Sequence, residues 1–101
     1  MYIVFTTVSD LAEGESLAEK IVTEKVAACV QILPKMTSVY VWKGELKNEP
    51  EHLLLIKTLE NNYDELEELI KENHSYDVPE IIAVESEEVA DGYFKWMSSR
   101  L

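Results

Sequence analysis

Hydrophobic and polar positions along the first quarter of the chain change from strand-like to helix-like spacing. Residues 1–8 open with a run of apolar, β-forming side chains and predict a strand. Ser9 or Asp10 then offers an N-cap, and Glu13 lies three positions after Asp10, as in a capping box. A helix is therefore expected over residues 11–25, with its buried stripe at Leu17, Ala18, Ile21 and Val22.

The middle of the chain has extended spacing. Residues 27–42 show no helical period and contain Pro34, which cannot donate a ladder hydrogen bond and so marks a bulge or a break in an edge strand. The sequence KNEP at 47–50 is the best turn before the next apolar run, HLLLIKT at 52–58. We expect strands on both sides of that turn.

The second half repeats the helix-strand pattern and adds a last helix. Asn61 or Asn62 caps a helix whose apolar face runs from Tyr63 to Asn73, and Pro79 ends the segment that follows. A strand at 80–84 and a short helix at about 88–99 complete the order βαββαβ plus a C-terminal helix. Two right-handed crossovers in this order predict an α+β, ferredoxin-like sandwich with an antiparallel sheet and a long hairpin arm.

Two features of this fold favour self-association. The predicted strands are apolar at both parities, at Tyr2–Phe5, Val39–Trp42, Leu53–Ile56 and Ile81–Val84, although the two crossover helices cover only one face. Residues 27–42 would also extend about 50 Å, whereas a compact domain of this length is about 35 Å across. A closed homo-oligomer solves both problems. The alternative is that Pro34 divides the segment into two short strands within one subunit.

Composition narrows the class of protein. With 101 residues, the chain is expected to form one domain, residues 1–101. The net charge of −11 argues against nucleic acid as a partner, because phosphates require clustered Lys and Arg. The start, MYIVFTTV, resembles neither a signal peptide nor a membrane span, so no membrane partner is expected. The single cysteine fits a reducing, cytoplasmic compartment.

Several motifs together resemble one known family. They are AACVQILP at 27–34, SVYVWKGEL at 38–46, LLLIKT at 53–58, NHSYDVPEI at 73–81 and YFKW at 93–96. In order and spacing they are similar to the CutA divalent-cation-tolerance family. The resemblance implies a ferredoxin-like homotrimer built through its long β-arms, a cytoplasmic location and a link to copper and other divalent cations. It also implies an architectural kinship with the trimeric PII signalling proteins. The family usually has His-Pro-Tyr where this chain has His74-Ser75-Tyr76.

Three residues are candidate metal ligands. Cys29 is the only thiol, and a thiolate suits copper or zinc, although free cysteine inside a strand is also a common small hydrophobe. His74 ends the second predicted helix, where it either opposes the helix dipole or serves as a ligand. Glu80 could add a carboxylate. No CxxC, HxH or HxxxH is present, so any such site would assemble between subunits.

A small ligand pocket between protomers is the other candidate site. Lys57, Tyr76 and Asp77 are its expected residues, because a lysine ending an apolar strand either reaches solvent or faces a cleft. Tyr40 and Trp42 are expected to pack across the trimer interface.

The chain carries no nucleophile elbow, P-loop or dinucleotide fingerprint, so we do not expect an enzyme. The expected function is divalent metal ion tolerance, with weak binding of Cu²⁺ or another divalent cation and no organic cofactor. Two alternatives stay open. One is a PII-like regulator that binds a small anionic ligand at subunit clefts, and the other is a structural or anchoring trimer.

Overall fold

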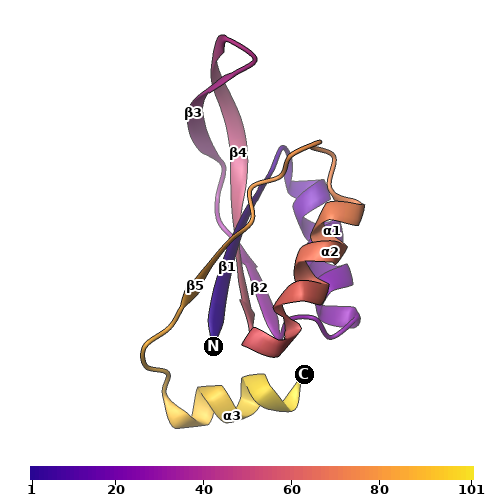
Figure 1. Ribbon diagram of the computed structural model, residues 1–101, viewed down its shortest axis with the longest axis vertical. Coiled ribbons are helices and arrows are strands. Elements are labelled where there is room, and N and C mark those ends of the chain that lie inside the picture. Colours follow the sequence, from indigo (N-terminus) through magenta and orange to yellow (C-terminus); the bar gives the residue numbers. More distant parts are fainter.

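The computed structural model describes all residues from Met1 to Leu101 as five strands, three α-helices and one short 3-10 turn (Figure 1). In chain order these are β1 (Tyr2–Val8), α1 (Leu11–Thr23), β2 (Cys29–Ile32), β3 (Met36–Trp42), β4 (Glu45–Thr58), the turn Glu60–Asn62, α2 (Tyr63–Asn73), β5 (Ile82–Glu85) and α3 (Asp91–Ser99).

All strand pairs are antiparallel, and β4 is the longest strand of the sheet. The strand order is β2-β4-β1-β5, and β3 also pairs with β4. Helices α1 and α2 lie together on one face of the sheet (Figure 1). The predicted ferredoxin-like sandwich is therefore confirmed.

The core lies between this face and the two helices. Val4, Leu54 and Ile56 point from the sheet towards Ile21 of α1 and Ile70 of α2, and all five side chains are fully buried. Even-numbered residues of β1 and β4 face the helices because side chains alternate along a strand.

Gly14 permits α1 to pack close to the sheet. A Cβ atom at this position would lie 3.1 Å from Cγ2 of Val8, which is closer than ordinary van der Waals contact. This contact explains why a glycine stands in the first turn of the helix despite its low helix propensity.

The hairpin between β3 and β4 turns at a different place from the one predicted. Lys43 and Gly44 both have positive φ, 51° and 80°, as a type I′ turn requires. The prediction of a turn at 47–50 is therefore wrong, because β4 runs straight through these residues. Beyond the pairing of Val8 with His52, β4 has only β3 as a neighbour, and an edge strand tolerates Pro50.

The extended segment 27–42 is interrupted around Pro34, as the alternative prediction of two short strands within one subunit expected. Strand β2 ends at Ile32 and β3 begins at Met36, and both pair with β4 of the same chain. The hairpin of β3 and β4 still projects from the body as an arm (Figure 1). The molecule measures 45 × 25 × 22 Å, and the long dimension matches a 14-residue strand of about 46 Å.

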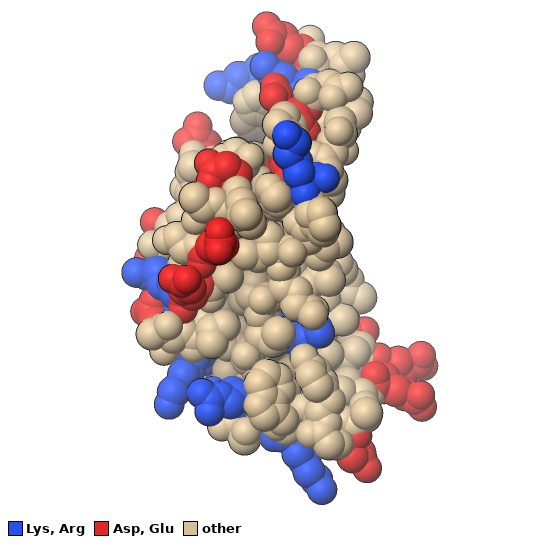
Figure 2. Space-filling model, turned by 180° about the vertical axis from the view of Figure 1, so that it is seen from behind, with Lys and Arg blue, Asp and Glu red and all other residues tan.

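Much apolar surface is left uncovered. Only 18 of 101 residues are buried, and the accessible surface is 6482 Å² against about 5,800 Å² expected for a monomer of this mass. Seen from behind, the molecule presents a broad middle surface that is largely free of charged side chains (Figure 2). The large exposed apolar side chains are Leu11, Val22, Val39, Tyr40, Val41, Trp42, Leu46, Val78, Ile82, Val84, Tyr93, Phe94 and Trp96.

The face of the sheet opposite α1 and α2, here called the open face, contains part of this surface. Ile3 and Phe5 of β1 lie on it, beside Val84 and Ile82 of β5, which are about half exposed. Helix α3 reaches only one end, where Nζ of Lys57 lies 5.3 Å from the ring centroid of Tyr93. No helix of the structure is both long and apolar enough to cross a membrane.

Candidate functional site

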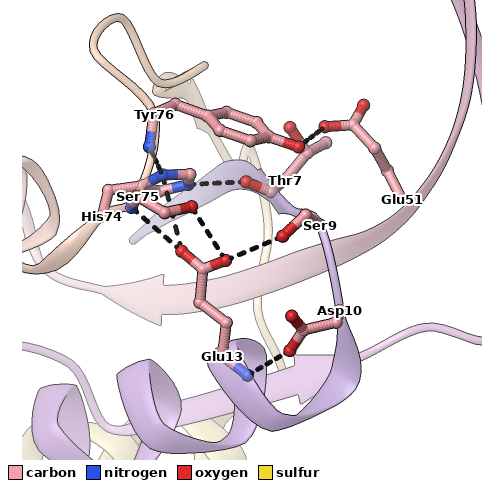
Figure 3. Close-up of polar contacts among 8 residues, drawn as sticks. All are labelled: Thr7, Ser9, Asp10, Glu13, Glu51, His74, Ser75 and Tyr76. Atoms are coloured by element: carbon pink, nitrogen blue, oxygen red, sulfur yellow. Dashed lines mark hydrogen bonds and ion pairs between the residues drawn. The ribbon is translucent and has the colours of Figure 1, made fainter.

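The connector between α2 and β5, residues 74–81, is fixed to the end of β1 by His74 (Figure 3). The His74 side chain is fully buried. Its Nε2 lies 2.7 Å from the carbonyl oxygen of Thr7, and its Nδ1 accepts a 3.0 Å hydrogen bond from the backbone N–H of Tyr76. Because a carbonyl can only accept, these partners assign the proton to Nε2. Both ring nitrogens are therefore engaged within the chain.

Glu13 ties the same connector to the first turn of α1 (Figure 3). Its carboxylate accepts hydrogen bonds from the backbone N–H and the hydroxyl of Ser75, both at 3.0 Å, and from the hydroxyl of Ser9 at 3.1 Å. Partial burial acts to raise the pKa of Glu13, but the hydrogen bonds from Ser75 and Ser9 and the nearby His74 outweigh it, and the pKa falls below its ordinary value. Asp10 caps the helix as predicted, accepting a 2.8 Å bond from the N–H of Glu13.

Tyr76 links residues 74–81 to the base of the arm by a hydrogen bond. Its hydroxyl donates a 2.7 Å hydrogen bond to Oε2 of Glu51 on β4 (Figure 3). Partial burial, the bond to Glu51 and the charge of that carboxylate all raise the pKa of the Tyr76 phenol far above its ordinary value. The phenol therefore stays protonated and remains a donor.

Next to this pair is a hollow of about 540 Å³, here called the acidic pocket. It is lined by three carboxylates, three aromatic rings and four smaller residues: Glu51, Asp77, Glu80, Tyr40, Trp42, Tyr76, Thr7, Ser38, Val39 and Val78. The strand residues among them come from β1 and from the arm, where they extend from Glu51 at its base to Trp42 beside the turn, and the remainder come from the connector.

The acidic pocket has no basic residue in its lining. Glu51 is 6% exposed although it is a carboxylate, and it accepts its hydrogen bond from a neutral phenol. Partial burial, and then the charge of Glu51, raise the pKa of Glu80. The negative charge of Glu51 therefore disfavours the ionised form of Glu80.

The three predicted metal ligands do not meet within one chain. Cys29 pairs with Lys57 on β4, whereas His74 bonds to Thr7, which pairs with Leu53. The four residue steps from Leu53 to Lys57 correspond to about 13 Å along the strand. No group of three His, Cys, Asp or Glu side chains is close enough to hold a metal ion. Metal ligation by Cys29, His74 and Glu80 stays a prediction.

The predicted pocket residues are only partly brought together. Tyr76 and Asp77 both line the acidic pocket. Lys57 is absent from the lining and lies against Tyr93 near α3. Tyr40 and Trp42 line the pocket while 40% and 43% exposed, and their packing across subunits stays a prediction.

Sequence reasoning missed two residues that organise this region. Glu51 follows the KNEP stretch, and its neighbours Glu49 and Pro50 made it resemble a surface charge. Glu13 was assigned only to the helix cap, although it also binds Ser75, 62 residues away. Neither partnership has a local sequence signal.

The family model and the most similar known proteins point to the same family. The family model described as "CutA1 divalent ion tolerance protein" matches residues 2–100. The Arabidopsis thaliana protein named "Protein CutA, chloroplastic" is 42% identical over 97 residues, which are 96% of this chain and 53% of that protein. The Thermus thermophilus "Divalent-cation tolerance protein CutA" is 39% identical over 94% of this chain and 92% of its own.

Solved structures agree with the sequence comparison. The crystal structure of CutA1 from Oryza sativa superposes with a TM-score of 0.95 at 42% identity, covering 98% of this chain and 91% of that one. The chain spans about half the length of the first two plant relatives, from Arabidopsis thaliana and Oryza sativa.

Proposed function

This chain belongs to the CutA1 divalent ion tolerance family, and we propose that it takes part in divalent-cation tolerance by binding divalent cations weakly, copper among them. The observation that carries the proposal is the family match over residues 2–100. We propose a binding role and no catalysis. We further propose that residues 1–101 act as one domain and that the protein works in the cytoplasm. Two plant relatives are named chloroplastic, so the compartment needs a direct test.

We propose that the working form is a homotrimer. The exposed arm and the half-exposed side chains of Ile82 and Val84 on the open face support self-association, because monomers rarely leave such patches uncovered. The excess of about 700 Å² over the surface expected for a monomer points the same way. A ring of three copies closes the contacts and leaves no free arm.

A metal site between copies is compatible with this assembly. Cys29 is half-buried on the edge strand β2, beside Lys57 of the open face, where a second copy can bring further ligands to it. His74 would have to give up one of its two hydrogen bonds before a ring nitrogen could bind a metal. Among the candidate ligands, Cys29 therefore needs the least rearrangement.

The PII-like alternative with an anionic ligand has weaker support. The acidic pocket carries three carboxylates and no base, so it repels anions. Lys57, the cation expected to hold such a ligand, lies elsewhere.

Titration calorimetry of the assembled protein with CuCl₂ tests the metal proposal. We expect saturable binding that is lost in Cys29→Ser and kept in the matched control His52→Ala, since His52 bonds to the carbonyl of Leu33 and is not a candidate ligand. Heats that stay unsaturated in the wild type would contradict the proposal. Equal binding by both variants would remove Cys29 from the site.

A further inference from the structure

The arm, residues 36–51, is joined to the body of the molecule by few contacts. Within the arm β3 and β4 pair only with each other, because the pairing of β1 with β4 stops at His52. Residues 33–35, through which the chain enters the arm from β2, belong to no strand. A two-stranded hairpin is only marginally stable on its own. The direction of the arm therefore depends on what holds its base (Figure 1).

One side-chain hydrogen bond reaches the arm from outside it. The Tyr76 hydroxyl donates this 2.7 Å bond to Oε2 of Glu51, which stands opposite Met36 in the first residue pair of the arm (Figure 3). No other side-chain hydrogen bond and no ion pair links the arm to the rest of the chain. Glu51 is 6% exposed, so breaking the bond leaves a buried carboxylate without its donor.

The segment that carries Tyr76 is itself held to two elements of the body. The buried ring of His74 bonds to the carbonyl of Thr7 on β1, and Glu13 of α1 accepts two hydrogen bonds from Ser75. Tyr76 follows directly, and its backbone N–H bonds to Nδ1 of His74. The phenol therefore projects from a part of the connector that is anchored to both β1 and α1.

We propose that the connector is a strap that holds the arm at one angle to the body, attached to the arm by the Tyr76–Glu51 hydrogen bond. The six residue steps from Glu51 to Glu45 correspond to about 20 Å of arm beyond this attachment. A rotation of roughly 10° at the base would move the tip by about 3.5 Å, which is enough to lose van der Waals contact with a neighbouring molecule. Release of the strap therefore displaces the tip more than the base.

The angle of the arm has a consequence for assembly, and this consequence rests on the proposed homotrimer. Near the tip, Trp42 and Leu46 are 43% and 75% exposed. Three copies close a ring only if each arm presents these side chains to its neighbour in the same direction. An arm that is already held in that direction loses less conformational freedom when the copies associate. Tyr76 is thus a positioning residue for the assembly.

Hydrogen exchange measured by mass spectrometry tests the strap, with Tyr76→Phe as the variant. Amides in peptides spanning residues 36–47 should exchange at least about tenfold faster than in the wild type, because a hydrogen bond to a buried carboxylate is lost. Amides of residues 2–8 in β1 should keep their wild-type rates. The matched control is Tyr63→Phe, which removes a hydroxyl bonded to Glu67 at 3.0 Å within α2 and should leave exchange in the arm unchanged.

Two further measurements separate the attachment from its effect on assembly. Glu51→Leu removes the acceptor, so the arm should exchange as fast as in Tyr76→Phe, and the double variant should be no faster than either, because all three lack the same bond. Light scattering over a dilution series should place the dissociation midpoint of Tyr76→Phe at a several-fold higher protein concentration than that of the wild type or Tyr63→Phe.

Several results would overturn the proposal. Equal acceleration in the arm and in β1 would show that Tyr76 stabilises the whole fold, and wild-type exchange in the arm of Tyr76→Phe would show that the bond does not hold it. Additive effects in the double variant would remove the Tyr76–Glu51 pair as the attachment. A wild-type dissociation midpoint despite faster exchange would overturn the role in assembly. If the wild type itself scatters as a single chain, the homotrimer fails, and the exchange rates still decide whether the strap exists.

Discussion

Replacing Glu13 by Gln tests the link between α1 and the connector. The carboxylate accepts three hydrogen bonds, two from Ser75 and one from Ser9. A glutamine keeps one acceptor oxygen, but its amide nitrogen would face the N–H of Ser75, donor against donor. Loss of one charge-assisted bond and weakening of the others should lower the free energy of unfolding by about 1–2 kcal/mol at pH 7.

The same substitution should show a pH dependence of known sign. Folding lowers the pKa of Glu13 below its ordinary value of 4.5, so its stabilisation is fully present above that value. The stabilisation is lost as the pH falls through the lower, folded-state value. The difference between wild type and Glu13→Gln should therefore shrink as the pH falls below 4.5.

Urea unfolding at fixed protein concentration measures both effects as a shift of the midpoint at constant slope. The matched control is Glu15→Gln, an exposed position on the same helix with no hydrogen bond to the connector, which should change stability by less than about 0.5 kcal/mol. Equal effects of the two variants at pH 7, or a difference that does not shrink as the pH falls below 4.5, would refute the assignment of Glu13.

Three further changes follow from the structure. His74→Ala should lower the free energy of unfolding by about 2–4 kcal/mol in the presence of EDTA, because removing the buried ring removes two hydrogen bonds and leaves a cavity. A loss of stability seen only with metal present would contradict this prediction. Thr58→Val leaves the buried carbonyl of Val26 without its 2.7 Å donor and should lower stability by about 1–2 kcal/mol in urea unfolding. Val84→Lys on the open face should reduce the assembly mass in light scattering, whereas Val22→Lys on the exposed side of α1 should not.

Features set by neighbouring residues could be predicted from the sequence. The Asp10 cap, the burial of Leu17 and Ile21 in α1 and the end of α2 near Asn73 depend on local spacing and side-chain chemistry, and the structure agrees with each. The prediction that Val22 belongs to the buried stripe of α1 is wrong, because this side chain is 39% exposed. The strand order followed from the handedness of the crossovers.

Features set by long-range register could not be predicted. The stretch KNEP is polar and contains a proline, which suits a turn but equally suits an exposed arm strand paired on one side only. The turn at Lys43–Gly44 directly follows an apolar run, so these residues were read as part of one continuous extended segment. The position of Lys57 near α3, away from Tyr76, depends on how far β4 extends, and no local pattern reveals that length.

The molecular mass in solution tests the central claim that the arm and the open face of one copy are covered by other copies. Light scattering on the purified chain at micromolar concentration should give the mass of three copies of the 11.6 kDa chain, about 35 kDa. A folded species at 11.6 kDa under the same conditions would contradict the claim.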